Sequence, residues 1–370
     1  MLPREQRLAE VPRRAPDGRG LPPVDPAARA RLLTGLLRGV SRAFYLTVRV
    51  LPARLREPVG LAYLLARAAD TLADTRLLPP AERLAQLLAF RAQLVEPAST
   101  EALRAIEAAL TAGRALAEEK ELLQQLPQAF ALLESLEPGD HERIRRVVVT
   151  LTEGMAFDLT AFPREDGGGL VALKTGAELD AYTYYVAGCV GEFWTRTLVA
   201  HEPALRGWDA EALSAAGVRF GKALQLTNVL RDLPRDLRIG RCYLPEEDLL
   251  TAGLEPGDLR HPDAGARARP ILAKWLNTAL AHYDAAEAYT LAIPRRCARL
   301  RLAVLWPILI GLGTLERLAR EPRWLDPDVR VKVSRGFVYR TMLLSLPAAP
   351  SNALLGAWMR SMRRNVKRET

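Results

Sequence analysis

Apolar residues recur at spacings of three and four along most of the chain, with polar and charged residues between them. This period predicts a succession of amphipathic helices. They are expected at 58–74, 80–94, 99–133, 141–160, 178–200, 209–236, 270–291, 299–319 and 334–347. Clusters rich in Pro, Gly and Asp separate them, and no alternating stretch is long enough to indicate a strand. The pattern therefore predicts an all-α fold.

The first helix is predicted to begin at Asp25-Pro26, because aspartate caps helices and proline suits the first helical position. Residues 1–25 are rich in Pro, Arg and Gly and lack the apolar segment of a signal peptide, so we expect a disordered lead-in. No composition break divides the rest. We expect one helical domain over 26–350 and a basic C-terminal tail over 351–370.

Composition narrows the class of protein only a little. The 370 residues carry a formal net charge of +9, which suits an anionic ligand, an acidic membrane surface or nucleic acid. No nucleic-acid-binding motif accompanies the dispersed basic residues, so we expect no nucleic-acid partner. The cysteines lie far apart, which suggests neither a zinc site nor a disulfide framework and fits a reducing cytoplasm. The apolar run 302–315 is shorter than the roughly 20 residues of a membrane span, and predicts a core helix containing Pro307.

Two of the predicted helices carry a ladder of polar groups on one face. At about 100° per residue, one ladder lies at i, i+4, i+7 and i+11. Its members are Tyr63, Arg67, Asp70 and Asp74. The second ladder consists of Gln225, Asn228, Asp232 and Asp236, with Arg231 on its flank. Each ladder ends in a D-x-x-x-D pair within a helix otherwise rich in Leu and Ala.

A solvated acidic face is the ordinary explanation of a single D-x-x-x-D pair. Amides, a tyrosine and arginines among buried leucines favour instead a cavity with a polar ligand. Paired carboxylates suit Mg²⁺, which takes one or two carboxylates together with phosphate oxygens. Two such faces across a bundle would hold several Mg²⁺ ions and a diphosphate, with Arg67, Arg231 and Arg241 contacting its oxygens.

Pro234 lies between the second pair of aspartates. It either kinks the helix and re-aims Asp236, or marks a helix end near Leu233 that leaves Asp236 in a loop. The stretch "YVAGCVG" is also open to two interpretations: close helix packing, or room for an apolar ligand tail.

Several blocks together resemble the squalene/phytoene synthase family of head-to-head prenyl transferases. They are "SRAFYLTVRVLP", "AYLLARAADTLADT", "YTYYVAGCVGEFWT", "ALQLTNVLRDLPRD" and "GRCYLPEEDL", in the family's order over about residues 41–250. The resemblance implies a single-domain isoprenoid synthase bundle with a central cavity. It also implies that Asp70, Asp74, Asp232 and Asp236 act in catalysis by binding diphosphates through Mg²⁺.

The same resemblance implies further site residues. Substrate diphosphate contacts are expected from Ser41, Arg42, Phe44, Tyr63, Arg67, Gln225, Asn228, Arg231 and Arg241. Ala43 departs from the usual second serine of the first block. The family's active-site tyrosine, expected to assist proton removal, is either Tyr182 or Tyr185.

Within the family, the chain looks closest to squalene synthases. "RLAVLWPILIGLGTLERL" resembles their proline-containing apolar helix, expected to form a wall that keeps water out. "VRVKVSRG" resembles their NADPH-associated basic segment and suggests Lys332 and Arg335 as cofactor contacts, although Ser334 stands where a second basic residue is usual. A solvated basic turn is the alternative.

The resemblance thus implies a squalene synthase of sterol or hopanoid biosynthesis. It would condense two farnesyl diphosphates through presqualene diphosphate to squalene, with Mg²⁺ and NADPH. One alternative is a member that stops at presqualene diphosphate or makes dehydrosqualene, hydroxysqualene or phytoene. Another is a non-catalytic relative acting as an assembly factor or lipid-binding protein. We expect a cytoplasmic protein, with peripheral contact to the inner membrane surface as a further option.

Overall fold

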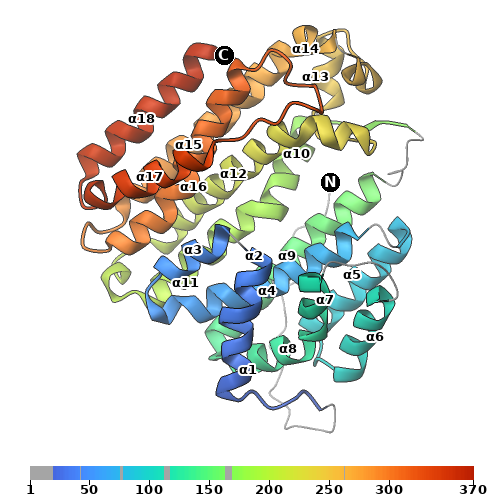
Figure 1. The fold of residues 1–370 in the computed structure, drawn as a ribbon, viewed down its shortest axis with the longest axis vertical. Coiled ribbons are helices and arrows are strands. Elements are labelled where there is room, and N and C mark those ends of the chain that lie inside the picture. The colour runs from blue at the N-terminus through green and yellow to red at the C-terminus, as the bar shows by residue number, and fades with distance from the viewer. Residues whose placement is uncertain (1–19, 42, 76–77, 112–116, 163–168, 262) are drawn as a thin grey trace.

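The computed structural model describes residues 20–41, 43–75, 78–111, 117–162, 169–261 and 263–370. Helices account for nearly all of its regular structure (Figure 1). The strands in this part of the chain are two short segments, β1 (Val171–Ala172) and β2 (Arg241–Cys242), which pair in parallel. The predicted all-α class is confirmed. Residues 1–19, where most of the expected lead-in falls, lie outside the described residues.

The first half of the chain is drawn from blue through teal to green in Figure 1. Its elements are α1 (Pro26–Ala30), η1 (Arg31–Leu36), α2 (Leu37–Ser41), α3 (Ala43–Val50), α4 (Ala53–Asp74), α5 (Pro80–Val95), α6 (Thr100–Thr111), α7 (Ala117–Gln124), α8 (Leu126–Glu134) and α9 (Pro138–Ala161).

The second half supplies the long central helices and those drawn in orange and red. Its elements are α10 (Gly176–Thr183), η2 (Tyr184–Gly188), α11 (Cys189–His201), η3 (Pro203–Leu205), α12 (Ala210–Arg238), α13 (Glu246–Thr251), η4 (Pro256–Arg260), α14 (Ala264–Arg267), α15 (Arg269–Ala292), α16 (Ala298–Arg320), α17 (Arg335–Ala348) and α18 (Asn352–Glu369).

Most helix boundaries agree with those predicted from the sequence. The exception is the predicted helix 99–133, and the structure also decides between the two alternatives at Pro234. The Asp25 side chain accepts a hydrogen bond from the Ala28 amide at 2.6 Å, so the predicted cap is confirmed. The continuous helix expected over 99–133 is wrong. Helix α7 ends at Gln124 and α8 begins at Leu126, because Pro127 has no amide hydrogen to continue the preceding helix. By contrast, α12 continues through Pro234 to Arg238, so the proline does not end it.

Glycines allow α11 and η2 to lie unusually close to α12. A Cβ atom added at Gly191 would lie 1.9 Å from the Gly217 carbonyl oxygen, and one at Gly221 would lie 2.2 Å from that of Ala187. Only glycine, which has no Cβ atom, permits two backbones to approach this closely. Of the two interpretations of "YVAGCVG", close packing is therefore the one that the contacts of Gly191 support. The packing fixes where α12 presents its polar ladder.

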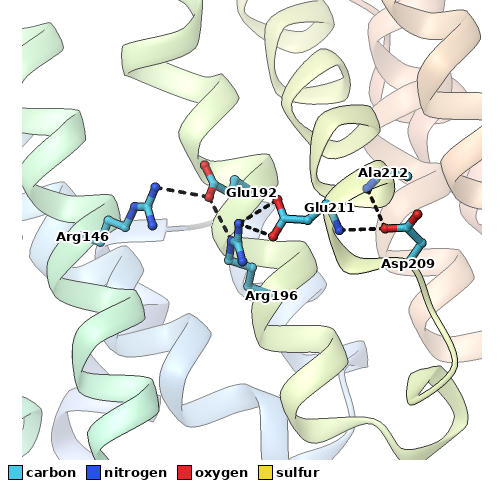
Figure 2. A network of polar contacts seen from close by, with 6 residues as sticks. All are labelled: Arg146, Glu192, Arg196, Asp209, Glu211 and Ala212. Atoms are coloured by element: carbon cyan, nitrogen blue, oxygen red, sulfur yellow. Dashed lines mark hydrogen bonds and ion pairs between the residues drawn. The ribbon is translucent and has the colours of Figure 1, made fainter. Parts of the chain in front are cut away.

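A surface network links α9, α11 and the start of α12. Figure 2 shows its members: Arg146, Glu192, Arg196, Asp209, Glu211 and Ala212. Arg196 donates to Glu192 within α11 at 2.9 Å and pairs with Glu211 of α12 at 3.0 Å. Such exposed pairs add little stability, about 0–1 kcal/mol each. They do, however, connect α9, α11 and α12 to one another.

The apolar helix α16 is a core helix, as predicted. It is long and apolar enough to cross a membrane, but 78% of its most apolar window is buried inside the fold. Pro307 lies within it. Helix α18 includes the segment set apart above as a basic tail, and it packs on α15 and α16 through buried residues such as Leu355 and Met359. Residues 352–369 therefore belong to the helical body.

Candidate active site

A cavity of about 320 Å³ lies among α4, α9, α12 and the chain around η2 and β2. This volume is near the lower end for ligand sites, about 300–1,000 Å³. Its polar lining residues are Asp70, Asp74, Asp158, Tyr182, Gln225, Asn228, Asp232, Asp236, Arg241 and Tyr243. Its apolar lining residues are Ala73, Leu151, Met155, Leu159, Val186 and Val229, together with Gly154. The structure thus brings both predicted acidic pairs to one cavity.

The first acidic pair stands at the end of α4. Arg67, one turn earlier, forms an ion pair with Asp70 and a second one with Glu119 of α7 at 2.9 Å. The Arg67 Nε atom is buried and has no hydrogen-bond partner within the described part of the chain. Asp74, the last residue of α4, is exposed and lines the cavity.

The second acidic pair lies on the continuous helix α12. Because the helix runs through Pro234, Asp232 and Asp236 stay one turn apart on the face that lines the cavity. Arg231 donates to Asp232 from Nε at 2.9 Å and again from its terminal nitrogen. One turn before, the Asn228 amide donates to Gln225 at 3.4 Å.

The carboxylates raise one another's pKa values. Burial, and then the charge of Asp70, raise the pKa of Asp74 to about 6, with Arg241 acting in the opposite direction. Burial, and then the charge of Asp232, raise the pKa of Asp236 to about 7, and Asp74 contributes to this rise. The two acidic faces therefore repel each other across the cavity, which a bound cation would relieve.

The residues fit Mg²⁺ bound together with a diphosphate. Within the described residues, no cluster of three or more His, Cys, Asp or Glu side chains forms an all-protein metal site. Mg²⁺ does not need one, since it typically takes one or two carboxylates and completes its shell with water and phosphate oxygens. Crowded carboxylates with raised pKa values, facing a shared cavity, supply such ligands.

Arg241 is held at the cavity by short strands and by a residue that sequence reasoning missed. Gly240, at φ +83°, turns the chain out of α12 into β2, a conformation that favours glycine. β2 pairs with β1 in the register Val171 to Arg241. The Arg241 guanidinium then forms an ion pair with Asp158 of α9. The block "GMAFDLTAF" around Asp158 lies at the end of α9 and contains no D-x-x-x-D pair that would mark this residue in the sequence.

The predicted tyrosines occupy different positions. Tyr182 lines the cavity, and its ring stacks on Tyr243 with centroids 4.8 Å apart. The Tyr182 hydroxyl is hydrogen-bonded to Tyr243, which donates to Asp158 at 2.6 Å. Burial, followed by the charge of Asp158, raises the pKa of Tyr182, so this phenol stays protonated near neutral pH. Tyr185 is not among the cavity residues and packs against α9 at Gly154.

Several predicted contacts do not line this cavity in the described part of the structure. Ser41 donates its hydroxyl to the Leu37 carbonyl within its own helix, and Tyr63 donates to the Val40 carbonyl at 3.5 Å. Arg67 and Arg231 are not in the cavity lining themselves, but each forms an ion pair with an aspartate that is. Arg42 and the side chain of Phe44 lie outside the described residues.

The C-terminal predictions also fall away from the cavity lining. Lys332 is exposed in the connection before α17, and Arg335 is the first residue of that helix. No residue of α16 lines the cavity among those that the structure describes, so the expected wall does not border it. Its apolar side chains fill the core instead.

Residues 37–336 match the family described as squalene/phytoene synthase. The chain belongs to the squalene/phytoene synthase family. Its members are prenyltransferase-type enzymes of isoprenoid biosynthesis. The family predicted from the quoted blocks is confirmed.

Relatives with different products match the chain at low identity. A squalene synthase of Mycosarcoma maydis is 24% identical over 333 residues, or 85% of this chain and 55% of the relative. A presqualene diphosphate synthase of Rhodopseudomonas palustris is 31% identical over 260 residues, or 70% of this chain and 77% of the relative. The chain thus spans little more than half the length of the fungal enzyme, and identities in this range do not fix the product.

A solved structure agrees with the fold. TcSQS in complex with a ligand superposes with a TM-score of 0.69 at 21% identity, covering 92% of this chain and 99% of that one. This likeness confirms the helical isoprenoid synthase architecture that the sequence predicts. It carries no information on the product.

Proposed function

We propose that this chain condenses two molecules of farnesyl diphosphate head to head, in a reaction that depends on Mg²⁺. Presqualene diphosphate is the first product, and squalene is the end product when NADPH is supplied. The observation that carries the proposal is the convergence of Asp70, Asp74, Asp232 and Asp236 on one cavity from two helices. Repulsion among these carboxylates suits cations, and the cations in turn suit a diphosphate.

The chain's own residues divide the work of the proposed condensation. Asp70, Asp74, Asp232 and Asp236 would hold Mg²⁺, which supplies positive charge against the departing diphosphate. Arg241 presents a permanent charge at the same cavity and is kept there by Asp158. Asn228 and Gln225 offer amide groups for the remaining phosphate oxygens.

Proton removal is assigned to the tyrosine that lines the cavity. Tyr182 is protonated, so it would receive a proton while passing its own to Tyr243, and Tyr243 would pass its hydroxyl proton to the Asp158 carboxylate, which becomes the final acceptor. Leu151, Met155 and Val229 provide an apolar surface for the prenyl chains. Such a surface also keeps water from a carbocation that would otherwise be hydrated.

A second candidate is a family member that stops at presqualene diphosphate. It is favoured by the position of Lys332 and Arg335, the residues expected to contact NADPH, which lie outside the cavity lining. Presqualene diphosphate synthases are also among the relatives at 30% and 31% identity that cover two thirds or more of both chains.

One incubation separates these candidates. Purified protein is given farnesyl diphosphate and Mg²⁺, with and without NADPH, and the extracted products are identified by mass spectrometry. Squalene only in the presence of NADPH supports the full proposal, and presqualene diphosphate in both tubes supports the second candidate. If farnesyl and geranylgeranyl diphosphate both remain unchanged, the chain is a non-catalytic relative and the proposal is wrong.

A further inference from the structure

Helix α17 leaves one face uncovered, and that face is apolar. Tyr339, Leu343 and Leu346 are 66%, 67% and 53% exposed, and Leu344 is also exposed. At about 100° per residue, Tyr339, Leu343 and Leu346 fall within one narrow sector of the helix. Most of the large exposed apolar side chains of the described residues lie between Tyr339 and Leu354. Exposure concentrated on one helix differs from the scattered exposure that is normal for a protein surface.

The opposite face of α17 is anchored to the core. Thr341 and Ser345 are buried, and the Ser345 hydroxyl accepts a hydrogen bond from the Trp306 indole of α16 at 2.9 Å. Phe337 packs so close to Gly313 of α16 that an added Cβ atom would lie 2.8 Å from its ring. Because these contacts fix the inner face of α17 on α16, the leucines of the outer face point away from the core.

Positive charge borders the apolar sector on both sides. Arg335 and Arg340 are exposed and lie on its two flanks at helical spacing. From residue 329 to residue 368 the chain contains no Asp or Glu, while it carries nine Lys or Arg residues. This large excess of positive charge is a local feature, since α17 and α18 together hold most of these residues.

We propose that the outer face of α17 docks this protein on the surface of an anionic lipid bilayer. Leu343, Leu346 and Tyr339 would enter the boundary between headgroups and acyl chains, and Arg335 and Arg340 would meet lipid phosphates beside them. An apolar face flanked by Arg or Lys is the arrangement of helices that lie in a membrane interface. Contact with a second copy through this face would bring Arg335 and Arg340 of both copies together, which disfavours self-association. The inference goes beyond the proposed reaction and does not depend on it.

The test measures binding of the full chain to vesicles without substrate. Wild-type protein is sedimented with vesicles of phosphatidylglycerol mixed with phosphatidylcholine, and with vesicles of phosphatidylcholine alone. Replacement of Leu343→Ser together with Leu346→Ser is expected to lower the partition coefficient on the anionic vesicles by about tenfold or more. The matched control is Leu250→Ser on α13, which removes a leucine of similar exposure, 64%, from another surface.

Charge is tested separately. Arg340→Ala should lower binding to the anionic vesicles by about fivefold, an effect that shrinks in high salt. Arg104→Ala, which removes an exposed arginine from α6, should leave binding unchanged. Thermal melting checks that every variant is folded, and diphosphate release in free solution should stay at the wild-type rate.

Three results would overturn the proposal. Wild-type protein that stays in the supernatant with anionic vesicles excludes membrane docking. Equal losses of binding in the α17 and α13 leucine variants exclude this face as the site. A concentration-dependent dimer that the Leu343/Leu346 variant abolishes, without vesicle binding, identifies the face as a contact between copies. None of these measurements depends on catalysis. A failure of the docking proposal can therefore be distinguished from a failure of the proposed function.

Discussion

The Tyr243 hydroxyl donates a hydrogen bond to Asp158 at 2.6 Å. The other carboxylate oxygen of Asp158 forms an ion pair with Arg241. One side chain from α9 therefore fixes both the arginine of the cavity and the tyrosine on which Tyr182 stacks. Asp158 is thus a positioning residue for the groups that would meet a diphosphate and a departing proton.

Asp158→Asn should lower the rate of diphosphate release by about a hundredfold, because Arg241 and Tyr243 lose their common anchor. Removal of the charge also leaves a largely buried arginine poorly compensated, so we expect a loss of about 2–3 kcal/mol in the free energy of unfolding. Denaturant titration and single-turnover assays measure the two effects. Asp180→Asn, which removes the charge of an exposed pair with Lys222, is the control and should change neither quantity much.

Asp70→Ala and Asp232→Ala should each lower Mg²⁺-dependent diphosphate release by at least about a thousandfold, since each removes a carboxylate proposed to hold the cation. Folding should survive, because both residues face the cavity and repel neighbouring carboxylates. Circular dichroism verifies the fold, and a diphosphate-release assay measures turnover. Asp328→Ala changes an exposed aspartate far along the chain and serves as the matched variant. Near-normal turnover in the Asp70 or Asp232 variant would remove that residue from the site.

Mg²⁺ binding should strengthen as pH rises from about 5 to 8. The pKa values of Asp74 and Asp236, raised to about 6 and about 7, mean that both side chains bind protons that the metal must displace. Without metal, the stability of the fold changes with pH in the opposite direction to Mg²⁺ binding. A carboxyl whose pKa is raised in the folded state binds more protons there than in the unfolded chain, so stability falls as pH rises from about 4 to 7.

Asp236→Asn removes one source of this repulsion. At pH 8 and without Mg²⁺, the variant should be more stable than wild type by about 1 kcal/mol, a value discounted from the pKa shift because cavity water screens the charges. Added Mg²⁺ with pyrophosphate should stabilise wild type and leave the variant nearly unchanged. Thermal melts across the pH range record both effects. A wild-type melting temperature that increases between pH 5 and 7 without metal would contradict the assignment.

The sequence was sufficient for features set by local pattern. Helical periodicity placed α4, α9, α12 and α16, and the Asp-Pro pair placed the start of α1. Spacing of seven and eleven residues also put each set of polar groups on one helix face, independently of tertiary structure. What the periodicity did not reveal was the break at Pro127, where a single residue lacking an amide hydrogen ends a helix within an unbroken apolar pattern.

Features that depend on long-range contacts were not predictable in the same way. Asp158 belongs to no D-x-x-x-D pair in the sequence, and its pairing with Arg241 spans 83 residues. The choice between Tyr182 and Tyr185 depends on which one the turn of η2 directs towards the cavity. Leu343 is likewise exposed because no helix of the described part of the chain covers that side of α17, and the periodicity of α17 itself does not reveal this. Each case needs the positions of elements distant in sequence.

Lys332→Ala combined with Arg335→Ala tests the expected NADPH segment. Both side chains are exposed, so the double variant should fold normally. If the chain completes the reductive step, squalene should decrease relative to presqualene diphosphate while the rate of diphosphate release stays near wild type. Product ratios by mass spectrometry provide the measurement, with Arg104→Ala as the comparison variant. Parallel loss of both steps would show that the segment supports the shared cavity instead.

Gly191→Ala tests the packing that positions the second acidic pair. The added Cβ atom would lie 1.9 Å from the Gly217 carbonyl oxygen, so α11 and α12 must move apart. We expect a loss of about 2–3 kcal/mol in stability, typical of overpacking between rigid backbones. Because α12 carries Asp232 and Asp236, Mg²⁺-dependent turnover should fall even where the variant remains folded. Gly207→Ala, which meets no atom within 4 Å, should be close to neutral. Equal unfolding midpoints for the two alanine variants would mean that this glycine contact does not determine where α12 lies.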